Sequence, residues 1–203
     1  MVKSHPYLGV HLQDDLGWNS HIGHATSKAR RMQGVISRNL YSCPQKLKET
    51  AYFSFVRPHV EYACTVWDPH QKNHKTKIER VQRNAARFVK SNYERTKGTV
   101  TNFLQDLGWQ PLEDRRRAAR LTLMYKITNN EVDIPSDHYL TPVTRPSRRN
   151  NSKSFLQHQK RLSSHNKSFF PRTIIDWNSL QEDIVKAPSV QAFKNHLYQI
   201  NQQ

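Results

Sequence analysis

The stretch of sequence that decides the fold spans residues 53–89. It begins with F-S-F-V-R-P-H-V-E-Y-A-C-T-V-W-D-P-H (53–70) and ends with I-E-R-V-Q-R-N-A-A-R-F-V (78–89). In the second part the apolar residues recur with the period of an α-helix and form one stripe: Ile78, Val81, Ala85, Phe88 and Val89. The polar residues on the opposite side are mostly cations: Arg80, Arg83, Asn84, Arg87 and Lys90. We therefore predict two helical segments that meet at a corner at residues 67–69, the second buried on one side and positively charged on the other.

The charge of the whole chain indicates the kind of partner. The 203 residues include 32 Lys and Arg against 16 Asp and Glu, a formal net charge of +16. Such an excess repels itself in a folded protein, so a polyanionic partner is the natural explanation. The cations are spread along several predicted helices, whereas a membrane-binding protein usually concentrates them beside one strongly apolar helix face. The composition therefore favours nucleic acid over a membrane surface.

The cysteines and the hydropathy pattern bear on the compartment. Cys43 and Cys64 form no C-x-x-C pair, and we expect two partly buried thiols in a reducing environment. No apolar run approaches the ~20 residues of a membrane span, and the N-terminus lacks the apolar core of a signal peptide. We expect an intracellular protein of the nucleus or cytoplasm, without contact with a membrane.

The N-terminal part predicts a strand followed by helices. Residues 6–12, P-Y-L-G-V-H-L, are typical of a short strand, which pairs either within this chain or with a sheet upstream of Met1. A helix is expected over about residues 20–38. The next begins at Pro44 and is kinked or broken at Pro58. Its expected buried side consists of Leu47, Ala51, Tyr52, Phe55 and Val56.

Further helices are expected after residue 99. One covers residues 100–107 and ends at Gly108; the next opens at residues 109–113 and packs centrally. Residues 134–167 carry prolines among Ser, Asn, Arg and Lys with little periodicity, so we expect an extended or partly disordered basic segment. Pro188 and Ser189 cap a last amphipathic helix.

Motifs in colinear order over essentially the whole chain carry a family resemblance. They are S-H-P-Y-L-G-V (4–10), D-D-L-G-W (14–18), R-N-L (38–40), C-P (43–44), A-Y-F-S-F-V-R-P-H-V-E-Y-A-C-T-V-W-D-P (51–69), I-E-R-V-Q-R-N-A-A-R-F-V (78–89), L-G-W-Q-P-L-E-D-R-R-R (107–117), P-S-D-H-Y-L-T-P (135–142), S-F-F-P-R-T-I-I-D-W-N-S-L (168–180) and A-P-S-V-Q-A-F-K (187–194). The chain resembles the carboxy-terminal region of reverse transcriptases from non-LTR retrotransposons of the jockey and CR1 type. It departs from that pattern at Gly17, where a Lys is common, and at Gln181, where a Pro is common.

The resemblance implies a fold and a domain organisation. Residues 1–18 would be a remnant of the last palm strand and its turn, in which Tyr7, Leu8 and Gly9 form a strand near the gripped primer end. Residues 19–133 would be a helical thumb-like domain, residues 134–167 an extended basic linker and residues 168–203 a C-terminal helical segment. The expected fold is mainly α, a thumb-like helical bundle with a short N-terminal β element.

The resemblance also implies what this chain does not do. The catalytic acidic pair of these polymerases lies in the palm, upstream of the residues that match here. Asp14 and Asp15 follow Tyr-Leu-Gly and are interpreted as a polar turn, because metal-assisted phosphoryl transfer needs a further carboxylate held nearby on a sheet. We therefore expect no enzyme activity and no cofactor; the Mg²⁺ of the parent polymerases has no ligands here.

Two groups of arginines are candidate contacts for nucleic acid. The first is Arg80, Arg83, Arg87 and Lys90, for which phosphate contact is favoured over a solvated face. The second is Arg115, Arg116 and Arg120, which contact either phosphates or the acids of neighbouring helices. His21 and His24 have a helical spacing but no further ligand pair, so no metal site is expected. The four tryptophans are interpreted as core residues rather than platforms for bases.

These observations lead to one predicted function and two alternatives. The prediction is a truncated fragment of a retrotransposon reverse transcriptase that binds the backbone of a primer–template, an RNA–DNA hybrid or other duplex, without reading its sequence. Its other partners would be the missing palm and fingers. The alternatives are a stand-alone basic helical nucleic-acid-binding protein and a non-functional remnant.

Overall fold

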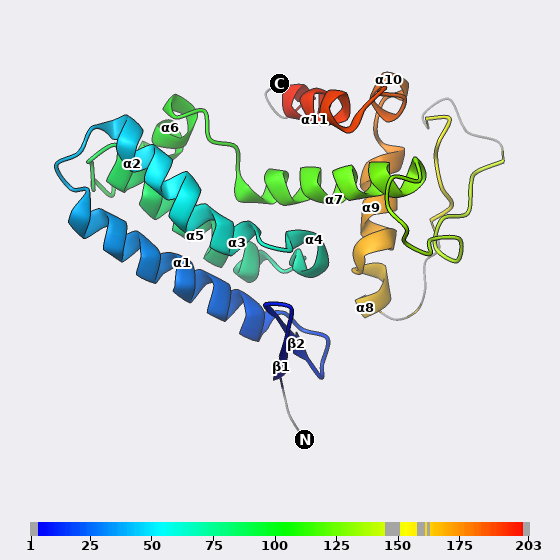
Figure 1. Cartoon of the computed structure of the whole chain (residues 1–203), viewed down its shortest axis with the longest axis horizontal. Helices are drawn as coiled ribbons and strands as arrows, with labels where there is room; N and C mark the ends of the chain where they lie inside the picture. The colour runs from blue at the N-terminus through cyan, green and yellow to red at the C-terminus, as the bar shows by residue number, and fades with distance from the viewer. Residues whose placement is uncertain (1–3, 145–150, 158–160, 162, 201–203) are drawn as a thin grey trace. The chain divides into compact units, whose positions relative to one another are not determined.

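The computed structural model describes residues 4–144, 151–157, 161 and 163–200. It is mainly helical and begins with a two-stranded antiparallel sheet, as the expected fold class states (Figure 1). The chain divides into two compact units, Met1–Arg115 and Arg116–Gln203. This division lies within a helix, whereas the sequence placed domain boundaries after residues 18, 133 and 167. The two units are described separately below.

The N-terminal β element is a hairpin rather than the single strand expected over residues 6–12. Strands β1 (Ser4–Tyr7) and β2 (Val10–Gln13) pair with Tyr7 opposite Val10. Leu8 (φ 46°) and Gly9 (φ 80°) form the connecting turn, so of the predicted strand Tyr7, Leu8 and Gly9 only Tyr7 lies in a strand. Leucine is unusual in the left-handed region. The Tyr62 hydroxyl stabilises the turn by donating to the Leu8 carbonyl oxygen at 2.9 Å.

One outward-facing position on each strand of this hairpin cannot offer a free N–H to a further strand. Because Tyr7 and Val10 flank a two-residue turn, the backbone groups of the next pair, Pro6 and His11, point away from the partner strand. The His11 N–H accordingly donates to the His21 imidazole. Pro6 has no N–H to offer a third strand. The predicted strand therefore pairs within this chain, which was one of the two alternatives.

The helices of unit 1 enclose a core around α5. They are α1 (Asn19–Asn39), α2 (Gln45–Ala51), the π-helical η1 (Tyr52–Val56), α3 (Arg57–Glu61), α4 (Cys64–Trp67), α5 (Lys72–Val89), α6 (Thr99–Asp106) and the start of α7 (Leu112–Thr128). All five residues of the predicted apolar stripe of α5 are buried. Helix α1 packs against α5, η1 and α3. The prediction of a one-sided helix in this stretch is confirmed.

Of the two outcomes predicted at Pro58, a kink or a break of the helix, the break does not occur. The Arg57 N–H bonds to the Tyr52 carbonyl oxygen, five residues back, and this wider turn directly precedes the proline, where an ordinary turn would crowd the ring. Ala51, Tyr52 and Val56 are buried as predicted, whereas Leu47 and Phe55, also expected inside, are 48% and 55% exposed. The helix ends instead at Glu61, and it is followed by Tyr62 (ψ 127°) and Ala63 (φ 49°).

Two predicted helix ends are confirmed. Helix α6 ends in a left-handed turn in which the Gly108 N–H bonds to the Gln105 oxygen and the Trp109 N–H to the Leu104 oxygen, both at 2.9 Å. In unit 2 the Ser189 hydroxyl accepts the Ala192 N–H at 3.2 Å at the start of α11 (Val190–Ile200). These caps fix where the neighbouring segments begin.

Unit 2 is built on the remainder of α7, with α8 (Ser163–Asn166), α9 (Phe169–Asn178), α10 (Glu182–Val185) and α11. Its core includes Leu121, Met124, Trp177, Phe193 and Leu197. Trp67, Trp109 and Trp177 are buried, as predicted, while Trp18 is only half-buried.

Within the predicted linker over residues 134–167, residues 151–156 are bonded to the rest of unit 2. Pro142 and Phe155 form an isolated antiparallel bridge, and the Trp177 indole N–H donates to the Lys153 carbonyl oxygen at 2.8 Å. The Asn178 side chain exchanges hydrogen bonds with the Phe155 backbone. Residues 151–156 thus pack on unit 2 through hydrogen bonds to their backbone, with Asn151 and Ser154 buried and Ser152 and Leu156 exposed. Residues 145–150, 158–160 and 162 of the predicted linker lie outside the described residues.

Candidate nucleic-acid interface

The charged side of α5 presents the first group of predicted contacts. Arg80 is exposed and Arg83 half-buried, and neither has a hydrogen bond or ion pair to another residue in the part of the chain that the structure describes. Both lie opposite the buried stripe of the helix. Their charges are therefore available to a partner in solution.

The other two residues of this group are already engaged. Arg87 donates from Nη1 to the Asn84 side-chain oxygen at 3.2 Å, which orients the guanidinium, and its Nε is buried without a partner among the described residues. Lys90 forms an ion pair with Asp106, its Nζ 3.3 Å from Oδ2. The Arg87 guanidinium is therefore held in one orientation in which a phosphate can approach it. The charge of Lys90 is partly neutralised by Asp106.

Helix α1 adds cations that the sequence did not connect to this surface. Helices α1 and α5 lie side by side and run in the same direction, because Asn19 contacts His74 and Lys77 lies against Gly23 (Figure 1). The Lys77 Nζ is 3.6 Å from where a Cβ on Gly23 would sit, and Arg38 Nη1 is 3.5 Å from the same position on Gly34. Arg30 lies on this side too, two turns after Gly23.

We call the resulting surface the α1–α5 basic surface and define it by Arg30, Arg38, Lys77, Arg80, Arg83 and Arg87. A helical projection of α1 shows where its cations lie relative to its apolar stripe. It does not show that α1 and α5 are neighbours, because this follows only from packing. The sequence therefore indicated which cations of α1 face outward, but not that they lie beside those of α5.

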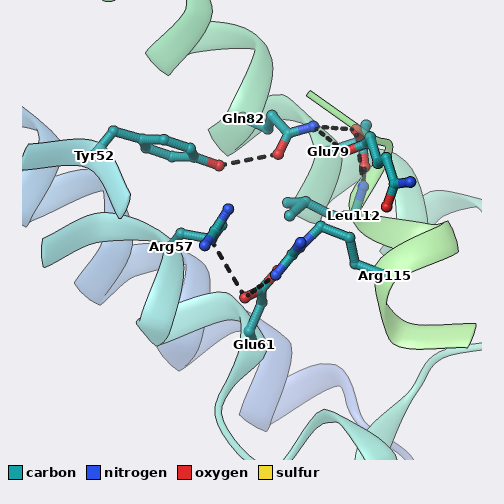
Figure 2. Close-up of polar contacts among 8 residues, drawn as sticks. Tyr52, Arg57, Glu61, Glu79, Gln82, Leu112 and Arg115 are labelled. Atoms are coloured by element: carbon teal, nitrogen blue, oxygen red, sulfur yellow. Dashed lines mark hydrogen bonds and ion pairs between the residues drawn. The ribbon is translucent and has the colours of Figure 1, made fainter. Parts of the chain in front are cut away.

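The residues of the second group of predicted contacts are paired with acids or buried. Arg115 bonds to both oxygens of Glu61, which also pairs with Arg57 at 3.4 Å (Figure 2). Arg116 is 0% exposed. Arg120 is 5% exposed and donates to Asp176 at 2.9 Å and to Thr173 at 3.2 Å. Contact with acids of neighbouring helices, one of the alternatives, is what the structure shows for Arg115 and Arg120. Burial likewise removes Arg116 from a solvent-facing surface.

A buried polar network holds α5 in place. The Tyr52 hydroxyl donates to the Gln82 side-chain oxygen at 3.1 Å (Figure 2). The Gln82 amide in turn donates to the Gln110 carbonyl oxygen at 2.9 Å. Burial raises the pKa of Tyr52, so this hydroxyl remains a neutral donor. The network fixes α5 to η1 and to the start of α7, and sequence reasoning missed it because its members lie up to 58 residues apart.

The remaining predicted features are located as follows. Asp14 and Asp15 lie in the turn after β2, where Asp15 Oδ1 accepts the Gly17 N–H at 2.7 Å. Cys64 is buried and Cys43 half-buried, and neither forms a disulfide. Within the described ranges no group of three or more His, Cys, Asp or Glu side chains is placed to hold a metal ion, and none of the described helices is long and apolar enough to cross a membrane.

Comparison of the chain with protein-family models, with curated protein sequences and with solved structures finds no match.

Proposed function

We propose that unit 1 binds the sugar-phosphate backbone of nucleic acid through the α1–α5 basic surface. The observation that carries the proposal is that Arg80 and Arg83 lie opposite the buried side of α5 and have no partner among the described residues. The net charge of +16 supports a polyanionic partner. Arginine suits phosphate because its planar donors match the oxygens.

The spacing of the cations supports contact with several successive phosphates. Arg80 and Arg87 are seven residues apart, which is about 10 Å along the helix at ~1.5 Å per residue. One strand of a duplex advances ~3.4 Å along its axis per phosphate, so this length matches about three phosphates. Such contacts position a duplex without reading bases, and we expect weak, salt-sensitive binding with no sequence preference.

Within this class, we propose that the chain is the thumb and connection region of a non-LTR retrotransposon reverse transcriptase. The colinear motifs from S-H-P-Y-L-G-V to A-P-S-V-Q-A-F-K support this assignment, and a mainly helical fold is compatible with it. In such a polymerase the chemistry belongs to the palm. The proposed role of these residues is to hold a primer–template, with palm and fingers as protein partners.

Fluorescence anisotropy with a labelled RNA–DNA hybrid tests the binding. The purified chain is titrated at several salt concentrations, and the logarithm of the binding constant is plotted against the logarithm of salt. A duplex contact gives a slope of about −0.9 for each phosphate neutralised. The double variant R80E/R83E should bind more weakly. Its slope should be shallower by the contribution of about two neutralised phosphates.

A matched control separates this surface from net charge alone. The variant K167E/K194E changes the net charge by the same amount, but at two exposed lysines of unit 2. It should retain most of the affinity and the slope of the unmodified chain. Equal losses in both double variants, or absence of binding at low salt by a folded sample, would overturn the proposal.

A further inference from the structure

The N-terminal hairpin is held to helix α1 by a small set of polar contacts. The His11 N–H donates to Nδ1 of His21 at 3.3 Å, and the Ser20 N–H donates to the Gln13 side-chain oxygen at 2.8 Å. Figure 1 shows the hairpin beside the start of α1. Only the first of these two contacts uses a titratable side chain, that of His21, which is 4% exposed.

This contact fixes the protonation state of His21. Because Nδ1 accepts a hydrogen bond, the proton of the neutral ring lies on Nε2. Nε2 is buried and has no hydrogen-bond partner among the described residues. The ring centroid lies 4.9 Å from that of Trp67. A second proton on Nδ1 would face the His11 N–H donor to donor, and it would place a charge beside an indole ring and away from water.

The groups around His21 make that charge costly. Strand β2 presents His11, and α1 presents His24, with Lys28 and Arg31 further along. The nearby start of α5 carries His74, which contacts Asn19, and Lys77, which lies against Gly23. Asp68 follows Trp67, and the exposed Asp14 and Asp15 follow β2. Burial first, then His11 and His24, lowers the pKa of His21 from 6.5 to about 4.

We propose that His21 is a proton-controlled latch: its neutral ring docks the β1–β2 hairpin on α1, and its protonation releases the hairpin. A ring with a lowered pKa in the docked state takes up a proton more readily when released. The contribution of His21 to docking is therefore fully present above about pH 6.5 and is lost as the pH falls toward 4. Over this range the equilibrium constant for docking of the hairpin falls by about two orders of magnitude at most. The inference does not depend on nucleic-acid binding.

Nitrogen NMR of the full chain with ¹⁵N-labelled histidine tests the latch directly. Long-range nitrogen–proton spectra distinguish the two ring nitrogens, and the same sample reports the His11 amide. We expect His21 to carry its proton on Nε2 at pH 7. As the pH is lowered, the His21 ring and the His11 amide should change with one common midpoint.

Two substitutions in the same cluster give the matched comparison. In H21N the amide oxygen can occupy the place of Nδ1 and accept the His11 N–H, but it cannot be protonated, so the hairpin should stay docked to pH 4. In H24N the exposed neighbouring histidine is replaced, and release should still occur. Its midpoint should lie at or slightly above that of the unmodified chain, because His24 helps to lower the pKa of His21.

Either of two results would overturn the latch. One is a proton on Nδ1 of His21 at pH 7 in the unmodified chain. The other is release of the hairpin in folded H21N at the same pH as in H24N. If H21N does not fold, the protonation state and the common midpoint in the unmodified chain decide the question.

Discussion

The carboxylate of Glu79 on α5 accepts the backbone N–H of Leu112, the first residue of α7, at 3.1 Å (Figure 2). The first N–H groups of a helix have no partner within it, and a negative charge there also complements the helix dipole. Glu79 therefore caps α7 from another helix and fixes its start, while the Leu112 side chain is buried. One residue of the basic helix thus determines where the next long helix begins.

Replacing Glu79 by alanine should destabilise unit 1 by about 1–2 kcal/mol, as for loss of a helix cap. The free energy of unfolding from urea titration gives the measurement. The matched control is E113A, which removes the partner of Lys75 in a largely exposed ion pair. That control should cost less than about 1 kcal/mol. Equal costs in E79A and E113A would show that the cap is unimportant.

The Tyr52–Gln82 hydrogen bond should show its strength only through a double-mutant cycle. The variant Y52F leaves the Gln82 oxygen without its buried donor, and Q82L leaves both the Tyr52 hydroxyl and the Gln110 carbonyl unsatisfied. We expect about 1–2 kcal/mol for Y52F and more for Q82L. The double variant should cost less than the sum by about 1 kcal/mol. Strict additivity would mean that the two side chains do not interact.

The local features of this fold could be predicted from the sequence. The stripe from Ile78 to Val89 repeats with the helical period, and a repeat of that kind depends only on neighbours in the chain. The Gly108 and Ser189 caps have the same local origin. The positively charged side of α5 followed from the same pattern, because residues opposite a buried stripe must face outward.

Features set by distant residues could not be predicted. Whether an arginine is free or paired depends on acids far along the chain: Glu61 is 54 residues from Arg115, and Asp176 is 56 residues from Arg120. The wide turn before Pro58 shifts the helix register by one residue, which a fixed helical period cannot express. Leu8 adopts a left-handed conformation stabilised by Tyr62, although leucine is not a turn residue.

The C-terminal end of α5 should respond differently to two substitutions at one position. Ser91 has a φ of 51°, its N–H bonds to the Phe88 oxygen, and its hydroxyl accepts a hydrogen bond from the buried Lys48 Nζ at 2.6 Å. Alanine at this position removes the acceptor and keeps the backbone strain. Glycine removes the acceptor but relieves the strain, which recovers about 0.4–1 kcal/mol.

Unit 1 should therefore be less stable in S91A than in S91G, as measured by urea titration. Adding K48M to S91A should recover part of the loss, because no buried ammonium then lacks its acceptor. If S91A and S91G are equally stable, the left-handed conformation of Ser91 is not maintained in solution. If K48M has no effect in the S91A background, the Lys48 contact contributes nothing.

Asn151 should be as important to unit 2 as a core residue, although the sequence around it predicted an extended linker. Its buried amide donates to the carbonyl oxygens of Trp177 and Leu180, at 2.9 and 3.2 Å, just where α9 ends. The variant N151A removes this donor from the Leu180 carbonyl and leaves the Trp177 carbonyl with the Leu180 N–H, and it should cost about 1–3 kcal/mol. N151D should cost more, because an aspartate cannot donate and faces two carbonyl oxygens.

Hydrogen exchange of the α9 amides, followed by mass spectrometry, gives the local measurement for these variants. Exchange should accelerate in the order unmodified chain, N151A, N151D, since opening of the helix end becomes easier. The control is S152A, which removes only an exposed hydrogen bond to Glu182 and should leave α9 unchanged. If N151A exchanged like S152A, residues 151–156 would be a surface segment. If protection falls in the stated order, residues 151–156 unfold together with α9. Their place in the fold is then set by hydrogen bonds from a side-chain amide, and not by the apolar periodicity on which the sequence prediction relied.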